Sequence, residues 1–503
     1  MLDQRRSGIL LHPTSLPGPQ PVGSLGEAAY RFVDWLVSAG QSVWQVLPLG
    51  PTGYGDCPYS CYSAFAGNPL LIDLQQLANL GDLALTDLPA LAPANNQADF
   101  DAAKDQLLPL LHQAHVFFKT HGSAERQKGF TRFCAAQGHW LDDYALFMAI
   151  REQQQQRPWQ DWPADIRQRQ AQALDQWSDR LADEIDRHKY IQFIFAEQWN
   201  ALKHYANERG VLIFGDLPIF VAEDSADIWA NQELFHLNED GRPSLVAGVP
   251  PDYFSSTGQR WGNPLYHWER VEAEDFRWWL SRFKWNFELF DLLRVDHFRG
   301  FTACWAIPAQ DETAENGHWL EAPGDRLFTR LNAEHPGQLP IIAEDLGIIT
   351  PEVEELRDKY AFPGMKVLQF AFDSDARNPY LPHNLQQNSV TYTGTHDNNT
   401  SLGWWQEQGP QNQARVSDYL GSPPEAMPWP LIRAAQAGVS RLAILPLQDV
   451  LALPASARMN RPGTANGNWH WRTLPDALSA AGAEQLRRLS HLYGRDLCFP
   501  TEM

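Results

Sequence analysis

The sequence predicts an α/β fold, a TIM (β/α)8 barrel with inserted, largely helical subdomains. Two observations favour this class. Eight short apolar runs recur along the chain, and each stops abruptly at polar or charged residues. Their apolar character is continuous rather than alternating, which is typical of parallel strands that helices bury on both faces. We therefore expect residues 1–503 to form a single barrel unit with insertions.

The runs define the expected strands in chain order. They are residues 8–15, 43–49, 211–216, 292–296, 340–345, 365–372, 390–397 and 442–449. Helical sequence separates several of them, at 28–39, 351–359 and 430–438. Strands that alternate with helices in this way predict eight strand–helix units around a parallel barrel.

Two gaps between runs are too long for simple crossovers. After the second run, Gln- and Ala-rich sequence predicts a helical insertion over about 75–207. After the third run, a second insertion is expected over about 217–290. It includes 235–264, which is rich in Gly and Pro and lacks clear periodicity, as a lid or binding loop does. The aromatic residues Tyr253 and Trp261 favour a segment that faces a ligand.

The charge of the chain limits its partners. Lys and Arg number 40 and Asp and Glu number 61, which gives a net charge of −21. A field of this sign repels phosphate backbones and anionic lipid, so nucleic acid and membrane surfaces are excluded as expected partners. A neutral ligand meets no such repulsion. The 20 tryptophans add flat rings of the kind that stack on sugars.

Cysteines and apolar segments indicate a cytoplasmic protein. The five cysteines are Cys57, Cys61, Cys134, Cys304 and Cys498. An odd, sparse set without a CxxC pair predicts reduced thiols rather than a disulfide framework or a zinc site. The N-terminal apolar stretch is too short for a signal peptide, and no run is long enough to span a membrane.

Acidic residues stand at the ends of several runs, where the mouth of a barrel places active sites. Arg294 and Asp296 are two apart and therefore share a strand face, so the guanidinium can keep the carboxylate ionised. The alternative is an ordinary ion pair of the barrel floor. An ionised, positioned carboxylate is the group required to attack an anomeric carbon.

The next run ends in Glu344 and Asp345, and strand parity does not choose between them. A carboxyl that emerges from apolar sequence is poorly solvated, which raises its pKa and favours a general acid. His396 and Asp397 end a later run, and Asp216 ends the third; each has a structural alternative. One ionised and one protonated carboxylate are the apparatus of glycoside chemistry. A divalent metal site is the competing interpretation, but Arg294 beside Asp296 disfavours a cation there.

The sequence closely resembles the amylomaltases, the 4-α-glucanotransferases or disproportionating enzymes of the α-amylase clan (glycoside hydrolase family 77). The similar segments run nearly the whole chain: 12–17, 53–59, 63–69, 215–220, 248–254, 258–264, 294–300, 343–347, 395–398 and 468–472. Where the family usually has a small or polar residue near positions 57 and 61, this chain has Cys57 and Cys61.

The resemblance implies a role for each candidate residue. Asp296 would be the nucleophile, Glu344 the general acid/base and Asp397 the transition-state stabiliser. The residues that it implies in substrate binding are Tyr59, Asp216, Trp261, Arg294, His297 and His396. The segment 235–264 is similar to the lid of the family. The resemblance, and not strand parity, selects Glu344 over Asp345.

The resemblance also implies the reaction. The enzyme would move an α-1,4-glucan segment from a maltooligosaccharide, amylose or glycogen to the 4-hydroxyl of glucose or another glucan, without metal or organic cofactor. Three alternatives stay open: an α-1,4-glucan hydrolase of the same clan, a non-catalytic glucan-binding barrel, and a metal-dependent barrel hydrolase. The presence of Asp296, Glu344 and Asp397 disfavours the non-catalytic protein.

Overall fold

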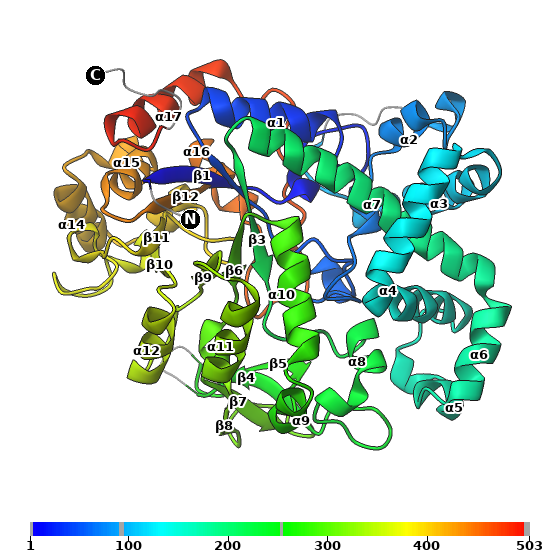
Figure 1. The fold of residues 1–503 in the computed structure, drawn as a ribbon. Helices are drawn as coiled ribbons and strands as arrows, with labels where there is room; N and C mark the ends of the chain where they lie inside the picture. Colours follow the sequence, from blue (N-terminus) through cyan, green and yellow to red (C-terminus); the bar gives the residue numbers. More distant parts are fainter. Residues whose placement is uncertain (1–3, 90–94, 252–254, 497–503) are drawn as a thin grey trace.

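Eight parallel strands form a closed barrel in the computed structural model, which describes residues 4–89, 95–251 and 255–496 (Figure 1). The barrel strands are β1 (Arg6–Leu10), β2 (Val43–Gln45), β3 (Leu212–Leu217), β6 (Leu292–Val295), β9 (Ile341–Ala343), β10 (Gly364–Val367), β11 (Ser389–Tyr392) and β12 (Leu442–Pro446). The order around the barrel is β1-β12-β11-β10-β9-β6-β3-β2, and β1 closes it by pairing with both β12 and β2. Each predicted run overlaps one of these strands, so the predicted fold class is confirmed.

All the barrel strands except β3 are shorter than the apolar runs that predicted them. The run at 390–397, for example, stays in the sheet only as far as Tyr392. Beyond it, the Thr393 hydroxyl donates a hydrogen bond of 2.6 Å to the buried carboxylate of Asp449 instead of continuing a ladder. The polar ends of most runs therefore lie beyond the strands at the barrel mouth, where strand alternation no longer dictates where side chains point; Asp216, which lies inside β3, is an exception.

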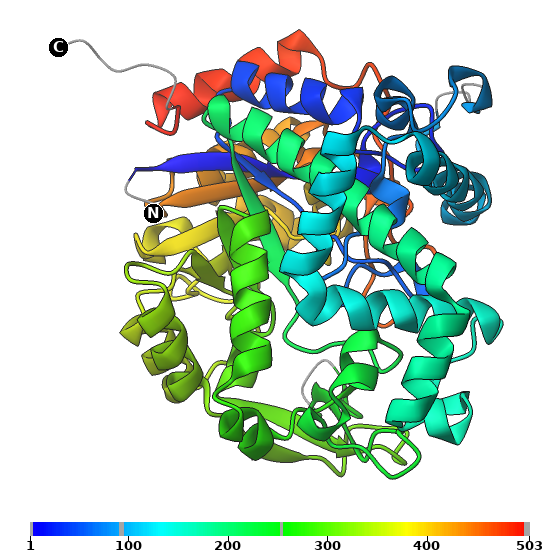
Figure 2. The same ribbon diagram turned by 45° about the vertical axis from the view of Figure 1, so that its right-hand side comes forward.

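Helices surround the barrel (Figure 2). Its outer layer contains α1 (Glu27–Ser38), α7 (Ala182–Glu208), α10 (Arg277–Leu289), α11 (Gly324–Glu334), α12 (Pro351–Lys359), α15 (Trp429–Ala437) and α17 (Ala480–Leu492). The helix α17 contacts α1, so the last helix of the barrel packs against its first. Shorter helices after β11 and β12 are α13 (Ser401–Glu407), α14 (Pro410–Leu420) and α16 (Leu447–Val450).

One expected strand–helix unit lacks its helix. Between β10 and β11, residues 368–388 are all described and contain only short 3-10 turns. Pro379 and Pro382 lie in this stretch, and proline disfavours a helix interior because it lacks the N–H donor. The Asn378 side chain holds the segment instead, since it donates to the Phe370 carbonyl and to the Asp373 carboxylate.

The chain between β2 and β3 is helical. It contains α2 (Leu74–Leu80), α3 (Phe100–His121), α4 (Ala124–Gln153), α5 (Ala164–Arg167), α6 (Ala171–Arg180) and the outer-layer helix α7. The long helix α7 contacts β3 and α1 at the barrel and packs along α4 beside it. In Figure 1 these helices extend from the barrel on the right of the view.

An antiparallel sheet that the sequence did not predict lies below the barrel in Figure 1. Its strands are β4 (Leu245–Val249), β5 (Gln259–Pro264), β7 (Ala303–Pro308) and β8 (His318–Glu321), in the order β5-β4-β7-β8. Two of them fall within 235–264, so the expectation of a segment without regular structure was wrong there. Strands β5 and β8 are too polar to show an apolar run, and each pairs with the strand before it in the chain, while β4 and β7 join the two halves of the sheet. The helices α8 (Ala226–Ala230) and α9 (Trp268–Ala273) belong to the same connection as β4 and β5.

Some sequence predictions fall on residues that the structure does not describe, namely Tyr253 and Cys498. Among the described residues, no helix combines the length and the apolar character that crossing a membrane requires.

Candidate active site

The acidic residues that the sequence singled out lie at the C-terminal ends of barrel strands. Asp216 is the second-last residue of β3, and Asp296 and Glu344 directly follow β6 and β9. These three strands are consecutive neighbours in the barrel. Asp397 lies in the loop that connects β11 to α13. The barrel thus brings four carboxylates, far apart in the sequence, to one mouth.

Arg294 connects two of these carboxylates. It pairs with Asp216 across β3 and β6, and its Nη1 donates to both carboxylate oxygens of Asp216 at 2.8 Å. Its Nη2 lies 2.7 Å from Asp296 Oδ1. Burial opposes the charge of the guanidinium, but the carboxylates of Asp216 and Asp296 outweigh it and raise the pKa of Arg294. The Asp296 carboxylate thus lies at the mouth with its side chain partly exposed and in a charge-assisted contact with this fixed cation.

Tyr59 extends this network from Asp216 to His396. Its hydroxyl donates a hydrogen bond of 2.7 Å to Asp216 Oδ2, and its ring stacks on the imidazole of His396 with the centroids 5.1 Å apart. The residue belongs to the long connection after β2, so only the fold places it beside β3 and β11.

Removing the Tyr59 hydroxyl tests this network. Tyr59→Phe keeps the ring but removes one of the charge-assisted hydrogen bonds to the buried Asp216, which retains those from Arg294; the lost bond is worth about 1.5–3 kcal/mol. We expect kcat/KM for maltotriose to fall by about tenfold or more. Tyr205→Phe is the matched control, because Tyr205 lies on the outer helix α7 and its hydroxyl donates to Asp34 of α1. Equal kinetics of the two variants would contradict a role for Tyr59 at the site.

Glu344 is held by two backbone donors. The N–H of His297 donates to Oε2 at 2.7 Å, and the N–H of Leu346 donates to Oε1 at 3.0 Å. Burial above all raises the pKa of Glu344 to about 7; the Arg294 charge opposes this shift and the Asp296 charge adds to it. A carboxyl with this pKa carries a proton in a large fraction of molecules at neutral pH, as a general acid must.

The adjacent Asp345 points elsewhere. It is buried, and its carboxylate accepts hydrogen bonds from Arg357 of α12 at 2.6 Å and from the Met365 N–H at 2.7 Å. These bonds tie β9 to β10 and to the outer helix layer. The geometry therefore leaves Glu344, and not Asp345, at the mouth beside Asp296.

His297 shapes the turn between the two candidate catalytic carboxyls. Its φ of 49° is in the left-handed region, and this conformation directs its N–H to Glu344. Burial lowers the pKa of its imidazole to about 4, so the ring is neutral at neutral pH. The Trp261 indole meets the His297 ring edge to face at 4.7 Å and is 39% exposed, so it has surface left for a ligand.

Asp397 lies beside His396. The His396 Nε2 is 3.3 Å from Asp397 Oδ1, and the same oxygen accepts a hydrogen bond of 2.6 Å from the Asn460 amide. The Asp397 side chain is 45% exposed, which leaves it open to a ligand. All nine residues that the sequence proposed for the site are thus described, and they converge on the mouth through these contacts.

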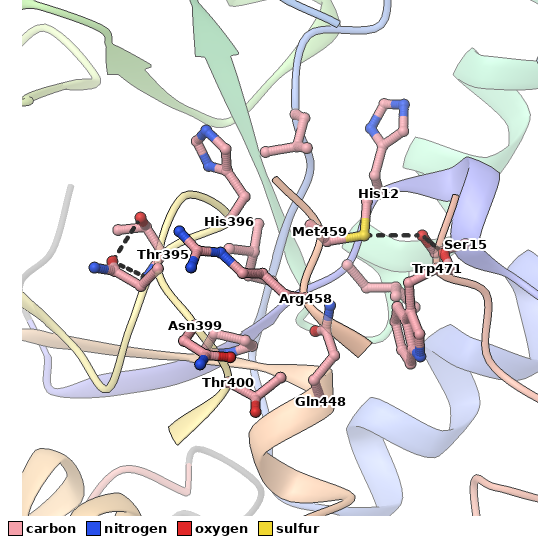
Figure 3. Close-up of a pocket in the computed structure, with 15 residues that line it drawn as sticks. His12, Ser15, Thr395, His396, Asn399, Thr400, Gln448, Arg458, Met459 and Trp471 are labelled. Carbon is pink, nitrogen blue, oxygen red and sulfur yellow. Dashed lines mark hydrogen bonds between the residues drawn. The ribbon is translucent and has the colours of Figure 1, made fainter. Parts of the chain in front are cut away.

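Several residues near the site escaped the sequence analysis. Figure 3 shows a pocket lined by His12, His396, Arg458, Met459 and Trp471, which come from three distant parts of the chain. Burial, with a smaller effect of His396, lowers the pKa of His12 to about 3, so this imidazole is neutral. The available signal for His12 was its place directly after the apolar residues 9–11 of the first run. No local pattern marked Arg458 or Asn460.

Known proteins that are similar to this chain identify its family. A family model described as 4-alpha-glucanotransferase matches residues 11–477. The chain belongs to the 4-alpha-glucanotransferase family. Curated members are similar over almost their whole length: the 4-alpha-glucanotransferase of a Synechocystis strain is 52% identical, covering 98% of this chain and 99% of its own. The 4-alpha-glucanotransferase of Thermus thermophilus is 50% identical, covering 97% and 98%.

Solved structures agree with this assignment. The amylomaltase of Streptococcus agalactiae, solved in complex with acarbose, superposes with a TM-score of 0.94 at 37% identity and covers 98% of this chain and 100% of its own. The likeness therefore includes the insertions and the antiparallel sheet of this 4-alpha-glucanotransferase as well as its barrel. Within the described ranges, no group of three or more His, Cys, Asp or Glu side chains is arranged to hold a metal ion.

Proposed function

We propose that this enzyme transfers α-1,4-glucan segments by retaining double displacement. The observation that supports it best is the pairing of two carboxyls in different surroundings at one mouth. Asp296 lies 2.7 Å from the Arg294 guanidinium, while burial raises the pKa of Glu344 to about 7. Glycosidases that retain configuration need such a pair, one to attack and one to donate a proton.

In the first half-reaction, Glu344 protonates the glycosidic oxygen while Asp296 attacks the anomeric carbon. The carbon–oxygen bond to the leaving glucan breaks, and a covalent β-glucosyl-enzyme forms. In the second, Glu344 takes the proton from the 4-hydroxyl of an acceptor, and that oxygen displaces Asp296. The inverted configuration is inverted again, so an α-1,4 bond results. Two side chains supply the acid and the nucleophile, and neither step needs a metal or organic cofactor.

We assign supporting roles to the other residues. Asp397 would hydrogen-bond the ring hydroxyls and strengthen those bonds as positive charge develops. Arg294, Asp216 and Tyr59 would orient the nucleophile, and His396 would contact the sugar next to the scissile bond. The exposed Trp261 and the remainder of 235–264 would cover the acceptor, excluding water so that a sugar hydroxyl reacts instead. A cytoplasmic location stays a prediction.

The products from maltotriose alone test the transfer. We expect glucose and a ladder of longer glucans, with little net gain of reducing ends. A hydrolase would release glucose and maltose with one new reducing end for each bond cleaved. A steady rise in reducing ends without longer products would therefore replace the transferase by the hydrolase. Activity that disappears in excess chelator would instead favour a metal-dependent enzyme.

A further inference from the structure

Residues 458–460, near the C-terminus, form hydrogen bonds to the loop that carries Asp397. The backbone N–H of Asn460 donates to the His396 carbonyl at 3.1 Å, and its side-chain Nδ2 donates to Asp397 Oδ1 at 2.6 Å. Arg458 adds a bond of 2.5 Å from Nη2 to the Asp397 carbonyl and one of 2.7 Å from Nε to the Asn460 carbonyl. Backbone and side chain of Asp397 are thus both held from residues more than 60 positions away.

These contacts give the two oxygens of the Asp397 carboxylate different surroundings. Oδ1 faces Asn460 and His396, while Oδ2 accepts no hydrogen bond from any residue within the described ranges. A carboxylate that is 45% exposed would otherwise rotate among several orientations. The Asn460 amide selects an orientation that leaves Oδ2 available to a ligand.

The Asn460 group that donates to Asp397 is uncharged, and this matters as much as where it lies. An amide is neutral, so it orients a carboxylate without neutralising it. The nearby cation, Arg458, directs its charge at backbone carbonyls instead of at the carboxylate. Asn460 and Arg458 therefore hold Asp397 without placing a cation on its carboxylate, which suits a ligand whose positive charge grows during reaction.

From these contacts we propose that Asn460 is a positioning residue of the reaction, which fixes the Asp397 carboxylate so that its free oxygen meets the sugar in the transition state. Arg458 supports it by fixing the backbone of both residues. This inference rests on the proposed function, because it takes Asp397 to act in the transition state.

Asn460→Ala tests the proposal through the separation of kcat from KM. A carboxylate that is no longer oriented loses a contact made mainly in the transition state, so kcat should fall by about 10- to 100-fold while KM changes by less than about threefold. The rates are measured with maltotriose, and the melting temperature is recorded to establish that the variant is folded.

Asn460→Asp gives a signature that a loop-holding role would not produce. At high pH the new carboxylate repels Asp397, whereas at low pH the two share a proton and an O–H···O bond replaces the lost amide bond. The activity of Asn460→Asp relative to Asn460→Ala should therefore rise as the pH falls from about 8 to about 5. Taking the ratio cancels the titration of Glu344.

Asn468→Ala is the matched control. Asn468 holds the same C-terminal loop, since it accepts from the Arg461 N–H at 2.9 Å and donates to the Thr464 carbonyl at 2.9 Å, but it is not bonded to Asp397. If it lowers kcat as much as Asn460→Ala, or if the Asn460→Asp ratio is independent of pH, Asn460 only orders the loop and the proposal is wrong. Wild-type kcat in Asn460→Ala overturns it equally. Both outcomes are separate from the product ladder, because the rate of bond cleavage can be followed whether transfer or hydrolysis ensues.

Discussion

Asp296→Asn is expected to slow the disproportionation of maltotriose by about three or more orders of magnitude. The amide keeps the size of the side chain but cannot form the glucosyl ester, and it also loses the ion pair with Arg294 at 2.7 Å. The measurement is kcat from initial rates of glucose release. A variant that disproportionates maltotriose at a rate comparable to that of the wild type would show that another group attacks the anomeric carbon.

Asp291→Asn is the control for this variant. Asp291 lies at the opposite end of β6, where its carboxylate accepts from the Ile213 N–H at 2.7 Å. The same substitution there is expected to lower stability and to leave kcat close to that of the wild type. A second readout uses Asp296→Ala with an α-glycosyl fluoride and azide, since azide can enter the space left by the carboxylate. A β-glycosyl azide is the expected product, because a single displacement inverts the configuration.

Glu344→Gln is expected to have the second-largest effect. General acid catalysis contributes about 10²–10⁴-fold, so the rate with maltotriose should fall by about that factor. With an α-glycosyl fluoride as donor the loss of glucosyl-enzyme formation should be much smaller, because fluoride leaves without a proton. An equal loss with both donors would show that Glu344 does not protonate the leaving group.

The pH profile gives the same assignment independently. Burial raises the pKa of Glu344 to about 7, and the first half-reaction needs its protonated form. We expect kcat/KM for maltotriose to decline as the pH rises through about 7, and this limb should be absent in Glu344→Gln. Asp345→Asn serves as control: it breaks the bond to Arg357, so it should lower the melting temperature and leave the basic limb in place.

The barrel was predictable because its signal is local. A strand that is buried on both faces needs a continuous apolar run, and all eight runs overlap barrel strands. The antiparallel sheet was not predictable in this way. Its edge strand β5 has the sequence QRWGNP, and such a strand forms only because β4 supplies the pairing partners. The missing helix between β10 and β11 likewise reflects how side chains such as Asn378 bond in the folded chain.

The sequence by itself determined the barrel and the acidic residues at its mouth, because apolar burial and the chemistry of a side chain are properties of each segment alone. Strand parity and side-chain chemistry did not decide which carboxyl faces the site, and the tertiary structure supplies the physical reason for the choice that the resemblance implied. Glu344 and Asp345 are adjacent and chemically alike, but Arg357 binds the second while the His297 N–H binds the first. The hydrogen bond from Asn460 to Asp397 likewise depends on the tertiary structure, because neither segment reveals it alone. Orientation at a strand end, and the pKa that follows from burial, depend on partners that are distant in sequence, and packing alone brings those partners together.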